Sequence, residues 1–227
     1  AVYYTGQDRD ITGLVLMKDS RLLRVVPLIQ SSKFTSKGLS ANWYSGPDTE
    51  KTLYMTNVSD NTIDTVLKLY DSAGNDVLSQ ALNLSAHETM TYSISKDLQI
   101  GLAQLTYSSG NPGDLIGQMV TKDAKKGDYD YLLKDASLAN SQSKVSPVFL
   151  NSPLEDPSGK GYIVLSNLSS VSISVNIGLI FEQNEIALAQ IDIPALSTLK
   201  RKLHGLTNEA LYGVEVTHTG NESDLTG

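Results

Sequence analysis

Two stretches of this chain decide its fold, because they carry the same pattern 110 residues apart. The first is LYMTNVSDNTIDTVLKLYDSAGNDV, residues 53–77, and the second is IVLSNLSSVSISVNIGLIFEQNEI, residues 163–186. Asn57 of the first stretch corresponds to Asn167 of the second. Solenoid repeats are typically about 20–50 residues long, so a longer period predicts one independent domain per repeat.

Both stretches alternate between two faces. The residues on the expected inner face are Ile63, Thr65, Leu67 and Leu69 in the first, and Ile173, Val175, Ile177, Leu179 and Phe181 in the second. A period of two is the signature of a half-buried strand. The turn-forming segments DSAGND, from Asp71, and FEQNE, from Phe181, lie between strand runs as hairpin loops do. The sequence therefore predicts an all-β fold of antiparallel strands.

The phase of the repeat defines the domains. LTYSSGNPGDLIG ends at Gly117, VTHTGNESDLTG ends at Gly227, and VYYTGQDRDITG ends at Gly13. The chain continues as GQMVTKD from Gly117 and as GLVLMKD from Gly13. We therefore predict that residues 1–19 are the tail of a repeat unit or an exchangeable strand. Residues 20–134 form one β-sandwich unit, and residues 135–227 form a second unit that lacks its closing strand.

This combination of strand and turn pattern resembles tandem immunoglobulin-like repeats of large secreted bacterial surface proteins. The residues that carry the resemblance are Asn57, Leu82, Leu84, Ala86, Gly110, Asp114 and Leu115, with the counterparts Asn167, Ile191, Ile193, Ala195, Gly220, Asp224 and Leu225. The resemblance implies two antiparallel β-sandwich domains, an extracellular location and a non-catalytic role. It identifies no ligand.

The amino-acid composition disfavours several classes of binding partner. The net charge of −7 disfavours nucleic acid, which requires a basic face, and the sequence has no polybasic patch for anionic lipid. The longest apolar runs are far shorter than the ~20 residues of a membrane-spanning helix. The chain has no cysteine, which excludes disulfides and thiolate chemistry. We expect no enzyme activity, no cofactor and a secreted or cell-surface location.

Two kinds of surface site are candidates. Asp114 and Asp224 lie in acidic turns, where carboxylates could bind calcium or could cap the turn through its backbone amides. Asn57, Asn83, Asn167 and Asn221 each begin an Asn-X-Ser sequence, which is the glycosylation acceptor pattern. The alternative for these asparagines is a structural role at strand ends, where asparagine tolerates turn dihedrals.

Two functions from different classes fit these observations. The first is a non-enzymatic structural or adhesive protein, a subunit of a filament or surface layer. Its copies would associate head-to-tail through strand exchange by Gly13, Leu14, Val15, Leu16 and Met17; if the chain is part of a longer array, neighbouring repeats replace these copies. The second is a module that binds carbohydrate or another surface ligand, for which Trp43, Tyr44 and Tyr54 could supply an aromatic patch.

Overall fold

The computed structural model of the chain describes residues 14–18, 23–27, 36–123, 127–132, 134–135, 143–149, 162–181, 184–202, 211–221 and 223–227. Every regular element within these ranges is a β-strand, and the strands that pair do so in the antiparallel sense. The prediction of an all-β antiparallel fold is therefore confirmed. We call residues 36–135 the first unit and residues 143–227 the second unit.

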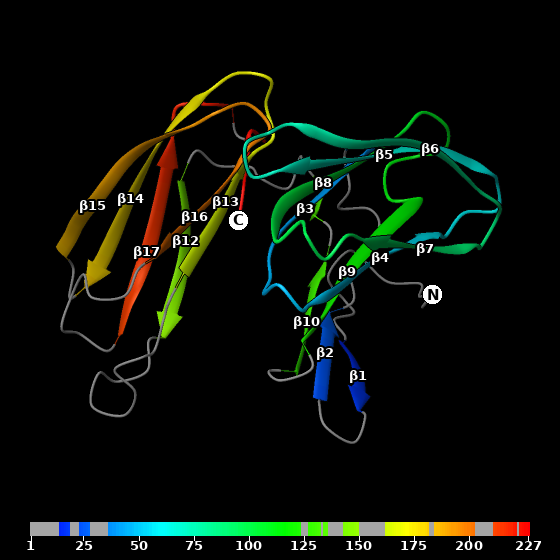
Figure 1. The fold of residues 1–227 in the computed structure, drawn as a ribbon, viewed down its shortest axis with the longest axis horizontal. Coiled ribbons are helices and arrows are strands. Elements are labelled where there is room, and N and C mark those ends of the chain that lie inside the picture. The colour runs from blue at the N-terminus through cyan, green and yellow to red at the C-terminus, as the bar shows by residue number, and fades with distance from the viewer. Residues whose placement is uncertain are drawn as a thin grey trace, which may run out of the picture.

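The described strands of the first unit form two sheets that lie in separate layers (Figure 1). One sheet has the order β10 (Gly127–Leu132), β9 (Leu115–Asp123), β4 (Glu50–Asn57) and β7 (Thr89–Ile94). The other has the order β11 (Lys134–Asp135), β3 (Gly38–Tyr44), β8 (Ile100–Tyr107), β5 (Ile63–Asp71) and β6 (Asp76–Leu84).

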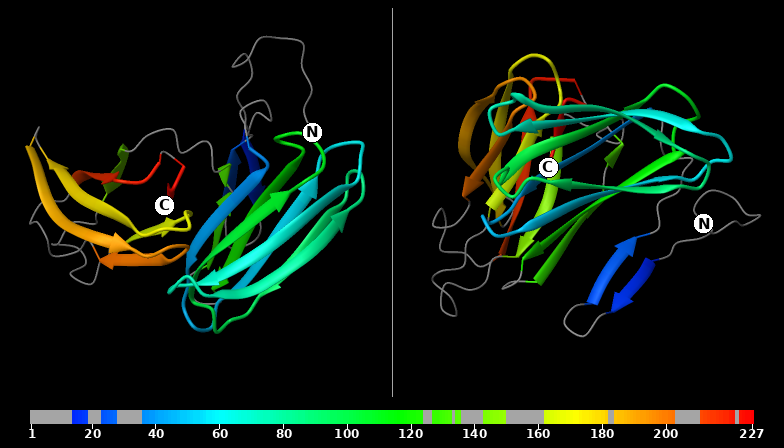
Figure 2. Two further views of the ribbon diagram at one scale, coloured as in Figure 1. Left: turned by 90° about the horizontal axis from the view of Figure 1, so that it is seen from above. Right: turned by 45° about the vertical axis from the view of Figure 1, so that its right-hand side comes forward.

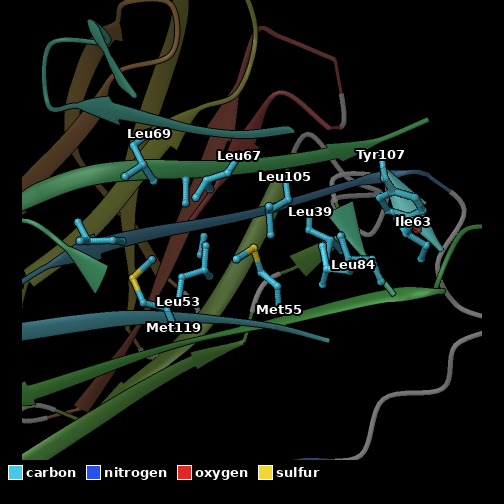
Figure 3. Packing of buried hydrophobic residues seen from close by; sticks show 14 of the residues in the cluster. Leu39, Leu53, Met55, Ile63, Leu67, Leu69, Leu84, Leu105, Tyr107 and Met119 are labelled. Atoms are coloured by element: carbon cyan, nitrogen blue, oxygen red, sulfur yellow. The ribbon is translucent and has the colours of Figure 1, made fainter. Parts of the chain in front are cut away.

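The core of the first unit lies between these sheets. Leu53 and Met55 of β4 and Met119 of β9 approach it from one sheet, and Leu67 of β5 and Leu105 of β8 approach it from the other (Figure 3). All five side chains are fully buried. Because alternate residues of each strand point inward, the two sheets bury one continuous apolar layer.

The second unit repeats this arrangement. One sheet has the order β16 (Thr198–Lys202), β13 (Tyr162–Asn167) and β18 (Leu225–Thr226). The other has the order β12 (Ser143–Phe149), β17 (Leu211–His218), β14 (Ile173–Phe181) and β15 (Asn184–Ile193). Its buried cluster takes residues from both sheets, namely Leu165, Ile173, Val175, Ile177, Ile193, Val214, Val216 and Leu225.

The predicted inner faces are confirmed where the structure describes them. Ile63, Thr65, Leu67 and Leu69 are all buried, and so are their counterparts Ile173, Val175 and Ile177. The side chains of Leu179 and Phe181 lie outside the described residues. Thr65 faces the core through its methyl group while its hydroxyl donates to the Thr106 carbonyl oxygen at 3.0 Å, which satisfies its polar atom.

The order of the strands is the same in both units, but it differs from that of an immunoglobulin domain. In an immunoglobulin domain the first strand pairs with the second, and the last strand pairs with the sixth. Here the first strand pairs with the sixth, as β3–β8 and β12–β17. The last strand pairs with the second, as β9–β4 and β18–β13. The two terminal strands have therefore exchanged sheets.

Two further strands precede the first unit. β1 (Leu14–Lys18) and β2 (Leu23–Pro27) pair with each other as an antiparallel hairpin, which lies beside the first unit in the views of Figure 2. Within this single chain the candidate exchange strand is therefore paired locally. At the other boundary, Lys134 and Asp135 pair with Ser40 and Leu39 of β3, so both residues belong to the first unit.

Candidate functional site at the junction of the units

Asn57 and Asn167 occupy equivalent positions, and each one connects strand ends within its own unit. Asn57 is fully buried, and its Nδ2 donates to the carbonyl oxygens of Asn61, Leu84 and Ser85 at 2.7, 3.1 and 2.9 Å. Its Oδ1 accepts from the backbone nitrogen and the hydroxyl of Ser59 at 2.9 and 2.8 Å. The asparagine side chain thereby connects the end of its own strand to the end of another strand.

Asn167 makes the same set of bonds in the second unit. Its Nδ2 donates to Val171, Ile193 and Pro194, and its Oδ1 accepts from Ser169. A glycan on either buried nitrogen would remove these bonds, so the geometry favours the structural role of the Asn-X-Ser pattern at both positions. The serine of the pattern is needed here as a hydrogen-bond donor to the asparagine.

The other two Asn-X-Ser positions are exposed. The Nδ2 of Asn83 donates to Oδ1 of Asp64 at 2.7 Å. The Nδ2 of Asn221 donates to Oδ2 of Asp224 at 3.1 Å. Both side chains lie at the surface, and glycosylation at these two positions stays a prediction.

The two calcium candidates serve their own loops. Oδ2 of Asp114 accepts from the backbone nitrogen of Asn111 at 2.6 Å, and Oδ2 of Asp224 accepts from that of Asn221 at 2.7 Å. This is the turn-capping alternative. Within the described ranges, acidic residues and histidines form no group of three that could hold a metal ion.

Trp43, Tyr44 and Tyr54 do not form the exposed aromatic patch that a sugar-binding surface requires. Trp43 is 1% exposed, and its Nε1 donates to the Leu98 carbonyl oxygen at 3.0 Å, so it closes one end of the core. Tyr54 is half-buried on β4, on the face opposite Leu53 and Met55. Tyr44 is exposed on the outer face of β3 and points to the second unit, where it meets Tyr162 with ring centroids 6.0 Å apart.

β13 differs from its counterpart β4 in the number of its residues that pair with the neighbouring strand on this side. β9 pairs with β4 from Asn57 to Glu50, whereas β18 pairs with β13 only at Asn167 and Ser166. Among the described strands, none pairs with residues 162–165 on this side. These four residues form what we call the β13 edge.

The first unit contacts the second through polar bonds, one of which lies at the β13 edge. Asn42 Nδ2 on β3 donates to the Val164 carbonyl oxygen at 3.2 Å. Gln104 Nε2 on β8 donates to the Leu168 carbonyl oxygen at 3.5 Å. The Thr198 backbone nitrogen of the second unit donates to the Ser72 carbonyl oxygen at 3.2 Å. β3 and β8 thus contact the second unit with their outer face.

A lysine held between two tyrosines completes this junction. The Lys200 Nζ lies 3.3 Å from the ring centroid of Tyr44 and 3.8 Å from that of Tyr162. Tyr44 belongs to the first unit, and the other two residues belong to the second. A cation over aromatic faces is attracted by the ring quadrupoles, and the attraction is about 0.5–1 kcal/mol at exposed sites. The three residues therefore form a clamp across the junction.

Apolar burial accompanies these contacts. Leu102 of β8 alternates with the core residues Ala103 and Gly101, so its side chain is on the outer face, yet it is 0% exposed. β16 contacts β8, and β13 contacts β3. The turn between β5 and β6 also reaches the second unit, where a Cβ on Gly74 would collide with the Ala195 carbonyl oxygen. Leu102 is thus buried on the outer face of a sheet that contacts the second unit.

The junction residues do not follow the internal repeat. Asn42 and Tyr44 correspond to Pro147 and Phe149 of β12, because β3 and β12 occupy equivalent registers on β8 and β17. Lys200 corresponds to Thr91. The residues that join the two units therefore break the repeat, which is why a search for repeated residues does not find them. Their only signal in the sequence is a polar or aromatic residue at outward positions of β3.

Among the described residues, three groups have shifted pKa values. Burial lowers the pKa of Lys51, and the Asp97 carboxylate opposes that shift. The Lys51 side chain is 1% exposed, and its Nζ donates to Ser45 Oγ at 3.2 Å. Burial raises the pKa of Tyr70, with a contribution from Asp76. Burial also acts to raise the pKa of Asp71, but hydrogen bonds from Asn75, Ala73 and Gly74 outweigh it and lower that pKa.

Sequence and structure comparisons with known proteins find little similarity. No protein-family model and no curated protein matches the chain. Among solved structures, a chaperone of Pseudomonas aeruginosa, CupB2, aligns with 74% of this chain and 86% of its own, at 10% identity and a TM-score of 0.18. A similarity at that TM-score supports no conclusion about fold or function. In the part of the chain that the structure describes, no helix is long and apolar enough to cross a membrane.

Proposed function

We propose that this protein is a non-enzymatic structural or adhesive protein of the cell surface, whose copies assemble head-to-tail by adding a strand to the β13 edge. The two units are then tandem sandwiches of the immunoglobulin-like class, with their terminal strands exchanged between sheets. The observation that carries the proposal is the likeness of β1 to β9, because β9 is the strand that pairs with β4, the counterpart of β13.

The donor strand of this proposal is β1. GLVLMKD, from Gly13, and GQMVTKD, from Gly117, both consist of an apolar run followed by Lys-Asp. The second of these sequences is the strand that pairs with β4. Addition of an extended segment to a sheet edge satisfies backbone groups on both partners and takes specificity from alternate side chains. A contact between different surfaces of successive copies need not close, and then builds a filament.

The alternative, a carbohydrate-binding module, depends on exposed aromatic faces. Trp43 is buried and Tyr44 is engaged by Lys200. The described aromatics therefore favour the structural proposal.

Deletion of residues 1–19 tests the proposal. Sedimentation velocity over a range of concentrations should show concentration-dependent polymers for the full chain and only monomers for the deleted chain. A second variant keeps the length of the segment and replaces Val15 and Met17 with Asp, which should also abolish assembly because these residues take the inward-facing positions of Met119 and Thr121. Equal assembly of the full and deleted chains would overturn the proposal.

A further inference from the structure

Several sheet edges among the described strands carry features that oppose pairing with another chain. β10 contains Asp128 and Asp130, β12 contains Pro147, and β16 contains Lys200 and Arg201. β15 is interrupted midway by an irregularity in its pairing with β14. Charged residues, proline and such irregularities keep an edge strand from pairing with a further strand. These four edges are therefore protected.

β6 is a nine-residue edge strand that lacks these features over most of its length. Residues 77–86 contain no charged residue, no glycine and no proline. The irregularity in its pairing with β5 lies at its beginning, beside Asp76. The edge strand β7 is also uncharged, but it has only six residues. β6 lies on the side of the first unit away from the hairpin of β1 and β2 (Figures 1 and 2). We call residues 77–84 the β6 edge.

The pairing of β5 shows which backbone groups of β6 point outward. The Ser108 nitrogen donates to the Asp64 carbonyl oxygen at 3.2 Å, so Asp64 directs its backbone groups toward β8. Alternate residues of a strand face opposite neighbours, so Thr65 directs its groups toward β6, where it pairs with Leu82. Leu82 and the alternate residues of β6 therefore bond within the sheet. The residues between them direct their backbone groups to the outer side of the edge, namely Ser79, Ala81 and Asn83.

These outward residues suit pairing with a copy of the same strand. Antiparallel pairing about a two-fold axis at Ala81 places Ala81 opposite Ala81 of the second copy, and Ser79 opposite Asn83 of the second copy. All three side chains are exposed. The chain has a net charge of −7, yet this pairing brings no like charges opposite each other, because the edge itself is uncharged. The partner that this edge fits is therefore a second copy of the chain.

Apolar burial would accompany the pairing. Leu78 and Leu82 are half-buried at the rim of the core of the first unit. A strand added to the β6 edge places its own side chains beside these two leucines and removes more of their surface from water. Burial of apolar surface is the main favourable contribution to most protein association.

We infer that two copies of the chain associate through their β6 edges about a two-fold axis, with Ala81 at the centre of the contact. This contact goes beyond the head-to-tail contact of the proposed function and uses a different strand. A two-fold contact closes on itself as a dimer. Combined with head-to-tail assembly, it would join two filaments side by side.

Disulfide formation between full chains tests the register, because the chain contains no cysteine of its own. Ala81→Cys should link to itself, since the Cα atoms of a hydrogen-bonded antiparallel pair lie about 5.5 Å apart. Ser79→Cys should link little to itself but should link to Asn83→Cys when the two chains are mixed. Ser79→Cys alone is therefore the matched control, on the same strand and equally exposed.

Sedimentation equilibrium measures the dimer in a full-length background that carries Val15→Asp and Met17→Asp, so that the head-to-tail contact does not contribute. Ala81→Lys should weaken the dimer about fivefold, because two lysines then lie opposite each other across the axis. Ser93→Lys, at an exposed position of the β7 edge, is the control and should leave the dimer unchanged.

The outcome separates this inference from the proposed function. A background protein that is only monomeric, or a dimer that Ala81→Lys does not weaken, would overturn the β6 contact. Linkage of Ser79→Cys to itself as fast as that of Ala81→Cys would overturn it as well. None of these results affects head-to-tail assembly, which is judged from the wild type and the chain that lacks residues 1–19.

Discussion

A single buried asparagine closes the corner of each unit. Asn57 satisfies three carbonyl oxygens and two donors of Ser59 within one fully buried site, and Asn167 repeats this arrangement. Leaving buried carbonyl groups without a donor costs more than the net gain of an ordinary hydrogen bond. The asparagine is therefore a structural residue of the repeat.

Replacement of Asn57 with Ala should destabilise the first unit by about 3 kcal/mol, because buried carbonyl groups lose their donor. Trp43 is the only tryptophan of the chain and lies in the first unit, so urea denaturation followed by its fluorescence reports that unit alone. Asn167→Ala is the matched control and should leave the tryptophan transition nearly unchanged. Equal transitions for Asn57→Ala and the wild type would show that the corner does not stabilise the unit.

Lys51 gives a second prediction at this scale. Because its pKa is lowered in the folded unit, the unfolded chain binds more protons between the folded pKa and the ordinary value of 10.5. Stability should therefore rise with pH in that window. Above about pH 10 the raised pKa of Tyr70 acts in the opposite direction, since the unfolded chain then loses that proton first.

Lys51→Met should remove the rise and stabilise the unit at pH 7 by about 1 kcal/mol, because the buried cation is replaced by an apolar side chain of similar length. Tryptophan-detected urea denaturation between pH 7 and pH 9.5 measures both effects. Parallel pH profiles of the variant and the wild type would contradict this assignment.

At the scale of elements, the turn between β5 and β6 connects the units. Gly74 has a φ of 86°, and its position against Ala195 leaves no space for a Cβ. Asp71 organises the same turn by accepting from the backbone nitrogens of Ala73 and Asn75, each at 2.9 Å. The turn is thus built from short local bonds and projects its glycine into the junction.

Gly74→Ala should separate the units without unfolding them. The expected result is a larger radius of gyration by small-angle scattering, with a loss of stability of about 1 kcal/mol from the left-handed backbone alone. Gly110→Ala is the matched control, because Gly110 has a φ of 76° but packs against Asp114 of its own unit. An unchanged radius for Gly74→Ala would show that this turn does not hold the junction.

The sequence predicts the faces of these strands better than their partners. Alternation assigns Ile63, Leu67 and Ile173 to the core because burial acts on every second residue. Alternation does not distinguish one neighbouring strand from another, so the pairing of β3 with β8 and of β9 with β4 could not be predicted. The pairing of β1 with β2 is likewise absent from the pattern.

In the whole molecule, the contacts at the junction determine how the two units are positioned. Asn42, Tyr44 and Lys200 join the two units, and each is a different residue type from its counterpart in the other unit. These residues could not be predicted from the sequence. Comparison of the two repeats identifies the residues that they share, whereas the junction residues differ between them.

A direct test of the proposed function is whether the β1 strand of one copy pairs with the β13 edge of another. Because the chain contains no cysteine, a Leu14→Cys chain and a Val164→Cys chain can be mixed and oxidised without interference. A hydrogen-bonded antiparallel pair has its Cα atoms about 5.5 Å apart, which a disulfide can span. Tyr54→Cys replaces Val164→Cys in the control, because β9 already occupies that position of the first unit. We expect mass mapping to identify a disulfide between positions 14 and 164 of different chains, with little linkage to position 54. The absence of the 14–164 disulfide, or equal linkage to position 54, would contradict it.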